Sequence, residues 1–72
     1  MQAPEPTAVT HAKQYWTEEG EEIFMCEAYG RRPDVRDSLR VFATGENRGE
    51  AQANARNTWR QAWWSLHTKS VL

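Results

Sequence analysis

Residues 38–67 read SLRVFATGENRGEAQANARNTWRQAWWSLH, and the spacing of apolar side chains changes within this stretch. The first part alternates apolar and polar residues, which is typical of a strand with one buried face. A break follows at Gly45, and Asn47 with Glu50 three residues later indicates a helix start of the capping-box kind. Residues 48–67 are rich in alanine, glutamine and arginine, which are compatible with a helix. The stretch therefore predicts a strand followed by a helix.

Two further strands are predicted before this stretch. Residues 12–17, AKQYWT, form a short aromatic strand, and the loop EEGEE after it contains Gly20, which can take the positive φ of hairpin loops. Residues 22–30, EIFMCEAYG, alternate so that one face carries Phe24, Cys26 and Ala28, and the other carries Ile23, Met25, Glu27 and Tyr29. We therefore expect the α+β class, with a three-stranded antiparallel sheet packed on one C-terminal helix in the order βββα.

A single α+β domain is expected over residues 11–67. Residues 1–10 hold two prolines and little apolar bulk, so they are predicted to be a disordered tail, and residues 68–72 a C-terminal tail. Cys26 is the one cysteine of the 72-residue chain, and a lone thiol favours a reducing compartment such as the cytoplasm. Because no run of about 18 apolar residues is present, we expect no membrane span and no membrane partner.

One stripe of the predicted helix is expected to face the sheet, because its members fall on one side at about 100° per residue. The stripe consists of Ala51, Ala55, Thr58, Trp59, Ala62, Trp63 and Leu66. Trp64 lies outside it and follows Arg60 by four residues, which is the spacing at which a guanidinium can stack on an indole. Two outcomes stay open for Trp64: an exposed aromatic beside arginine, or a ring folded onto the C-terminal tail at Val71 and Leu72.

Residue types with catalytic or metal-binding chemistry do not cluster in this sequence. His11 and His67 lie near opposite ends and have no partner at metal-ligand spacing. Cys26 lies on the predicted core face with no histidine nearby in the sequence. The glutamates around Gly20 lack the oxygen spacing of a calcium loop, and the chain contains no phosphate-binding loop. We therefore expect a protein that is not an enzyme and has no metal and no cofactor.

The charge is unevenly distributed along the chain, although the formal net charge is −1. Residues 1–30 contain six acidic side chains and one lysine, whereas residues 31–72 contain eight basic side chains, seven of them arginine, and four acidic ones. Tryptophan and arginine are enriched at interaction hot spots. The predicted partner-binding residues are therefore Trp64, Arg60, Asn57 and Arg56 on the outer side of the helix, and Arg31, Arg32 and Arg36 in the loop. For the loop, ordinary surface charge offset by Asp34 and Asp37 remains the alternative.

The sheet face away from the helix is expected to carry Met25, Glu27, Tyr29, Arg40 and Phe42. Because both faces of residues 22–30 are fairly apolar, coverage of the other face by the helix stays open. An alternative site for nucleic acid would use Arg40, Phe42 and Tyr29 of this face together with the arginine-rich loop. Residues 40–56, RVFATGENRGEAQANAR, resemble the strand-to-helix junction of the three-stranded DNA-binding domains of integrases and plant AP2-type factors. That resemblance implies that the sheet enters the major groove. The same stretch is similar to the last strand and helix of double-stranded RNA-binding domains, and EAQANAR to the helix start of HicB-type antitoxins.

The small size and the uneven charge also resemble those of small phage and mobile-element proteins, including anti-CRISPR inhibitors. This resemblance implies a phage- or prophage-encoded inhibitor that binds a host protein or protein complex in the cytoplasm of the host cell and acts by steric or charge-based occlusion. The sequence therefore predicts a non-enzymatic protein-binding module. A small DNA- or RNA-binding domain is the alternative, and a homodimeric structural protein is a further one.

Overall fold

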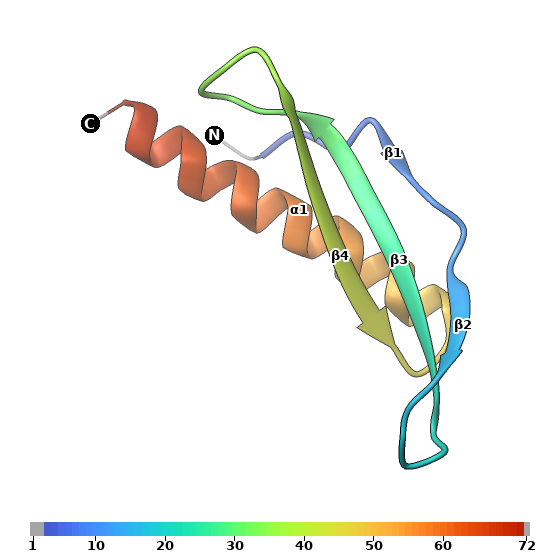
Figure 1. The fold of residues 1–72 in the computed structure, drawn as a ribbon. Coiled ribbons are helices and arrows are strands. Elements are labelled where there is room, and N and C mark those ends of the chain that lie inside the picture. Colours follow the sequence, from blue (N-terminus) through green and yellow to red (C-terminus); the bar gives the residue numbers. More distant parts are fainter. Residues whose placement is uncertain (1–2, 72) are drawn as a thin grey trace.

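The computed structural model describes residues 3–71. Along the chain lie β1 (Ala8–Val9), β2 (Lys13–Trp16), β3 (Glu22–Arg31), β4 (Ser38–Gly45) and α1 (Arg48–Ser70). All strand pairs are antiparallel and β3 is central, with β4 along one edge and β1 and β2 along successive parts of the other (Figure 1). The helix covers one face of this sheet. The predicted α+β class and the βββα order are confirmed, and β1 adds a short strand to the sheet.

The edge formed by β1 and β2 is interrupted by a bulge around Thr10. Val9 pairs with Ala28 while Lys13 pairs with Met25, so the register differs by one residue between the two strands. An extra residue on one strand leaves a local gap in the ladder of backbone hydrogen bonds. Thr10 fills the gap, because its N–H donates to the carbonyl oxygen of residue 27 at 2.8 Å and its Oγ1 accepts from the N–H of the same residue at 3.0 Å.

The structure differs from the sequence-based prediction at both ends of the chain. A disordered tail is predicted over residues 1–10, but Val9 packs against the core and belongs to the sheet. A tail is predicted over residues 68–72, but α1 continues to Ser70, whose hydroxyl donates to the carbonyl of His67 at 2.9 Å. Single contacts of this kind leave no periodic signal in so short a segment. Residues 1–2 and 72 lie outside the described residues.

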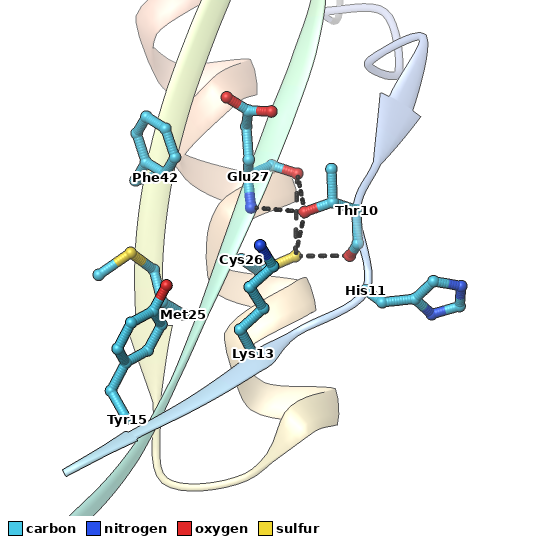
Figure 2. A pocket seen from close by; sticks show the side chains of 8 residues that line it. All are labelled: Thr10, His11, Lys13, Tyr15, Met25, Cys26, Glu27 and Phe42. Atoms are coloured by element: carbon cyan, nitrogen blue, oxygen red, sulfur yellow. Dashed lines mark hydrogen bonds between the residues drawn. The ribbon is translucent and has the colours of Figure 1, made fainter.

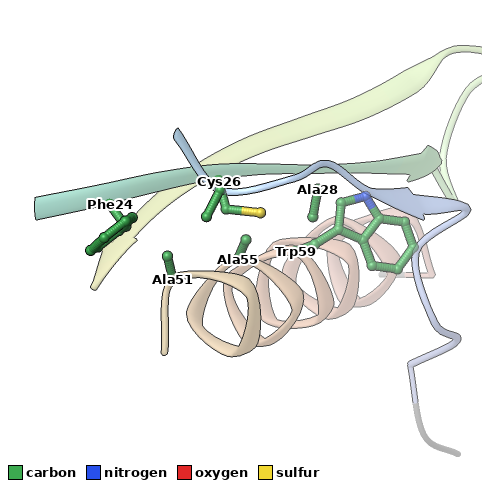
Figure 3. Close-up of a cluster of buried hydrophobic side chains, with 7 residues drawn as sticks. Phe24, Cys26, Ala28, Ala51, Ala55 and Trp59 are labelled. Carbon is green, nitrogen blue, oxygen red and sulfur yellow. The ribbon is translucent and has the colours of Figure 1, made fainter. Parts of the chain in front are cut away.

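The core lies between β3 and the first half of α1 (Figure 3). Its buried members are Ala12, Phe24, Cys26, Ala28, Ala51, Ala55 and Trp59. Small residues bring the two layers close together: a Cβ on Gly45 would lie 2.5 Å from the backbone nitrogen of Ala51, and one on Gly30 would lie 2.7 Å from Cζ2 of Trp59. The predicted inward face of the second predicted strand, residues 22–30, is confirmed.

The predicted helix stripe is confirmed for Ala51, Ala55 and Trp59, which are buried against the sheet. Trp63 is partly buried and packs against the same cluster. Thr58 is exposed, so its place in the stripe was wrongly predicted. The buried residues Ala51, Ala55 and Trp59 follow one another in steps of four residues, and Thr58 lies about 100° around the helix from its neighbour Trp59.

The start of α1 follows the predicted capping signal in part. The Oδ1 of Asn47 accepts a hydrogen bond of 2.8 Å from the N–H of Glu50, so the helix begins at Arg48 as expected. The carboxylate of Glu50 accepts from the N–H of Glu46 at 3.3 Å, one residue before the cap. In the described part of the chain, no helix is long and apolar enough to cross a membrane.

Candidate interaction surface

The sheet face turned away from α1, here called the open face, carries a group of partly exposed aromatic and apolar side chains. Strand register places on it Lys13, Tyr15, Ile23, Met25, Glu27, Tyr29, Arg40 and Phe42. Phe42 is 62% exposed and Tyr15 is 42% exposed, although both belong to regular strands. The five residues expected on this face from the alternation of the sequence are all found there. The alternative nucleic-acid residues Arg40, Phe42 and Tyr29 therefore lie on one surface.

A shallow pocket of about 180 Å³ opens on this face beside the bulge (Figure 2). Its lining residues are Thr10, His11, Lys13, Tyr15, Met25, Cys26, Glu27 and Phe42. Figure 2 shows Tyr15 and Met25 side by side, with Phe42 beyond them and Lys13 on the other wall. Pockets for small ligands usually hold about 300–1,000 Å³. This pocket therefore suits one side chain of a partner better than a whole cofactor.

Two charged groups of the open face, Arg40 and Glu27, pair with each other. The guanidinium of Arg40 donates to both carboxylate oxygens of Glu27 at 3.2 Å. It also lies over the ring of Tyr29, with 5.1 Å between Cζ and the ring centroid. Glu27 offsets the charge of Arg40, so Arg40 contributes a flat, partly apolar surface. Lys13 is exposed at the rim.

The predicted helix site is divided by the structure into two parts. Trp64 is 41% exposed, and its ring stacks with those of Trp63 at 6.0 Å and His67 at 5.5 Å between centroids. Of the two outcomes left open for Trp64, the structure shows the exposed aromatic. Val71, one of the two residues of the alternative, is 66% exposed, and Leu72 lies outside the described residues.

Arg60 does not stack on Trp64, contrary to the prediction from their spacing. Within residues 3–71 the cation–π contacts join Arg40 to Tyr29 and Arg48 to Phe24. Arg60 turns instead toward the N-terminal segment, where its side chain lies 3.8 Å from the carboxylate of Glu5.

Arg56 contacts the same Glu5 carboxylate at 3.3 Å, while Asn57 remains exposed between the two arginines along the helix. A full negative charge attracts a guanidinium more strongly than the face of an indole does, which explains this choice of partner. The helix arginines therefore fasten the N-terminal segment, and the aromatic group around Trp64 stands apart from them.

The arginine-rich loop is partly closed on itself. Arg32 donates two hydrogen bonds to the carboxylate of Asp34, at 2.9 and 2.7 Å. This pairing lowers the pKa of the Asp34 carboxyl below its ordinary value and raises the pKa of Arg32. Arg31 and Arg36 are exposed. One of the three loop arginines predicted to bind a partner, Arg32, thus stabilises the turn of its own loop.

Comparisons with protein-family models, curated proteins and solved structures gave no match. Among residues 3–71, no three histidine, cysteine, aspartate or glutamate side chains are grouped so that they could hold a metal ion.

The sequence analysis did not predict that Lys13 and Tyr15 of β2 would lie on the open face. The alternation of a strand over residues 12–17 does place these two side chains on one face. Their place beside Phe42 depends on the register across β3.

Proposed function

We propose that this protein is a non-enzymatic protein-binding module whose binding surface is the open face. One observation supports the proposal: Phe42 stands largely exposed on the edge strand β4, with Tyr15, Met25 and Tyr29 on the same sheet face. Aromatic residues, methionine and arginine are enriched in the cores of protein interfaces. Contiguous apolar groups on a soluble surface usually mark a contact with another molecule.

In this proposal, the residues of the open face contribute to binding in different ways. Phe42 and Tyr15 provide rigid apolar contacts, and Met25 adapts the floor of the pocket to an inserted side chain. Lys13 lies at the rim, where a charge orients a partner and speeds its approach more than it adds affinity. Arg40, whose charge is offset by Glu27, adds flat contact surface beside it. A partner with an apolar patch and an acidic border fits this arrangement.

The biological role that we propose follows the resemblance of the sequence. It is that of a phage- or prophage-encoded inhibitor that occludes a host protein in the cytoplasm of the host cell. The supports are the small size, the uneven charge and an exposed sheet face that can cover a surface by steric action alone. Occlusion of this kind needs affinity and shape, and no chemistry on the bound protein.

The test is capture of a partner by the immobilised full chain, compared across matched surface variants. The double variant Tyr15→Ala and Phe42→Ala should lose the partner, because hot-spot truncation costs about 2 kcal/mol or more per residue. Trp64→Ala, on the exposed part of the helix, should retain it. Circular dichroism would check that every variant is folded. Loss with Trp64→Ala and retention with the double variant would place binding on the helix and overturn the proposal.

Nucleic-acid binding is the second candidate function. It is favoured by the presence of Lys13 and Arg40 beside Tyr29 and Phe42, because such faces can combine phosphate contacts with base stacking. Binding of this kind weakens steeply as salt rises, since phosphate contacts release counterions. A gel-shift assay with duplex and single-stranded probes at low and high salt tests it. No shift at low salt would remove this candidate.

A further inference from the structure

The outer edge of β4 is a long, regular strand edge that pairs with no other strand of residues 3–71. It runs for eight residues, Ser38–Gly45, and contains neither proline nor a bulge. The opposite edge of the sheet is split into β1 and β2 by the bulge at Thr10. Soluble proteins usually protect strand edges by bulges, prolines, charges or coverage, because an unprotected edge pairs readily with another strand.

The direction of each backbone group on β4 follows from its pairing with β3. The N–H of Arg32 donates to the carbonyl of Asp37 at 3.0 Å, in the same register as the rest of the β3–β4 ladder. In an antiparallel ladder, residues directed at the partner strand alternate with residues directed away. The backbone groups of Ser38, Arg40, Phe42 and Thr44 therefore point away from β3.

Two side chains occupy the ends of this outward row. The N–H of Ser38 donates to the carboxylate of Asp37 at 2.7 Å. The carbonyl of Thr44 accepts from the side-chain amide of Asn54 at 2.8 Å, which confirms that this group points away from β3. Between these two caps, within the described part of the chain, no hydrogen bond occupies the outward groups of Arg40 and Phe42. The row is therefore capped at one group at each end, the N–H of Ser38 and the carbonyl of Thr44, and is open between them.

We propose that this edge pairs with the same edge of a second copy of the chain, antiparallel, with the two-fold axis beside Val41. Arg40 then lies opposite Phe42 of the second copy, and Ser38 lies opposite Thr44. The N–H of Ser38 and the carbonyl of Thr44 would be partners in this register, and these are the two groups already capped. The other outward N–H groups, those of Arg40, Phe42 and Thr44, each lie opposite an outward carbonyl of the second copy.

Neighbouring registers fit less well. An axis at Arg40 brings two guanidinium groups together and sets the capped N–H of Ser38 opposite the free carbonyl of Phe42. An axis at Phe42 sets the capped carbonyl of Thr44 opposite the free N–H of Arg40. In the register centred on Val41, the Arg40 and Phe42 side chains share the open face, so a guanidinium can lie over a phenyl ring. Arg40 already makes such a contact with Tyr29.

The pairing joins two sheets into one and puts both open faces on the same side. The C-terminal turns of α1 project past β4 on the side away from β3 (Figure 1). An added strand would run on the side of β4 to which these turns project, where Trp63 and Leu66 are only partly buried. The inference does not depend on the proposed function. It rests on the backbone edge of β4 and not on the side chains of the open face, and it is tested by the mass of the protein in solution.

The first test measures the mass of the full chain by sedimentation equilibrium over a wide dilution series. Twice the chain mass of 8.4 kDa is expected at high concentration, and a monomer at every concentration would overturn the proposal. Thr44→Pro removes an outward N–H and should give a monomer, since a proline is tolerated where the N–H faces away from the sheet. Thr44→Ala keeps that N–H and should still dimerise. Equal association of the two variants would rule out this edge as the interface.

The second test reads the register from charge. Phe42→Arg places like charges opposite Arg40 at two symmetric positions and should weaken association about tenfold. Phe42→Glu places opposite charges there and should retain the dimer, with an affinity that falls as salt rises. Equal weakening by both variants would contradict the register, because it would mean that residue 42 faces its own copy.

Discussion

The indole Nε1 of Trp59 donates a hydrogen bond of 2.9 Å to the backbone carbonyl oxygen of Leu39, so the most buried large side chain of α1 is tied directly to β4. Trp59 is 1% exposed and lies against Gly30, where a glycine leaves room for the ring. The other buried residues are mostly alanines, so this one ring supplies a large share of the buried apolar area. The stability of the domain is therefore concentrated at a single contact between the helix and the sheet.

Trp59→Ala is expected to destabilise the fold by about 3–5 kcal/mol, because it removes a buried ring and leaves a cavity. Trp59→Phe should cost less, since it loses the hydrogen bond to Leu39 and part of the volume. Trp64→Ala is the matched control and should cost under about 1 kcal/mol, because Trp64 lies outside the core. Urea unfolding followed by circular dichroism measures all three. Similar losses for Trp59→Ala and Trp64→Ala would contradict this assignment of the core.

Gly30→Ala should destabilise the protein by about 1–3 kcal/mol, because the new methyl group has no space. It would lie 2.7 Å from Cζ2 of Trp59 and 2.9 Å from the backbone nitrogen of Thr7. Gly49→Ala is the matched control: its Cβ would meet only the Oδ1 of Asn47, at 3.5 Å. Alanine is the better helix former, so this control should gain up to about 1 kcal/mol. Thermal unfolding of the two variants should shift in opposite directions.

The thiol of Cys26 should react slowly in the native protein and rapidly in denaturant. It is 1% exposed, and its Sγ–H donates to the carbonyl of Thr10 at 2.9 Å. Reaction then requires local or global opening, so a native rate lower by about a hundredfold or more is expected. A coloured thiol reagent measures both rates, with Cys26→Ser as the blank. Equal rates in buffer and in denaturant would contradict the buried position of this side chain.

Stability on the acid side should depend on Asp34. The hydrogen bond from Arg32 lowers the pKa of this carboxyl in the folded state, so the pair contributes above the ordinary aspartate pKa and is lost as the pH falls through the lowered value. The difference in stability between the wild type and Asp34→Asn should therefore be largest near neutral pH and shrink on acidification. Denaturant unfolding at a series of pH values tests this. A difference that grows as the pH falls would have the wrong sign.

Local periodicity was enough to predict the elements and the inward faces of the main ones. The alternation around Cys26 placed Phe24 and Ala28 in the core correctly, because side chains of a strand point to opposite faces in turn. The break at Gly45 and the cap at Asn47 placed the start of α1 at Arg48, because both act through groups a few residues away. Such signals lie in neighbouring residues and need no knowledge of the rest of the fold.

The tertiary structure alone decided which distant segments meet. Arg60 pairs with Glu5 across most of the length of the chain, and Thr10 fills the gap that the bulge leaves beside β3. The open face likewise exists only once β2 and β4 align Tyr15 and Phe42 on either side of β3. The amino-acid sequence by itself determined the period of each element and therefore the side it turns inward. The partners of its charges and exposed rings depended on long-range approach, which no local spacing encodes.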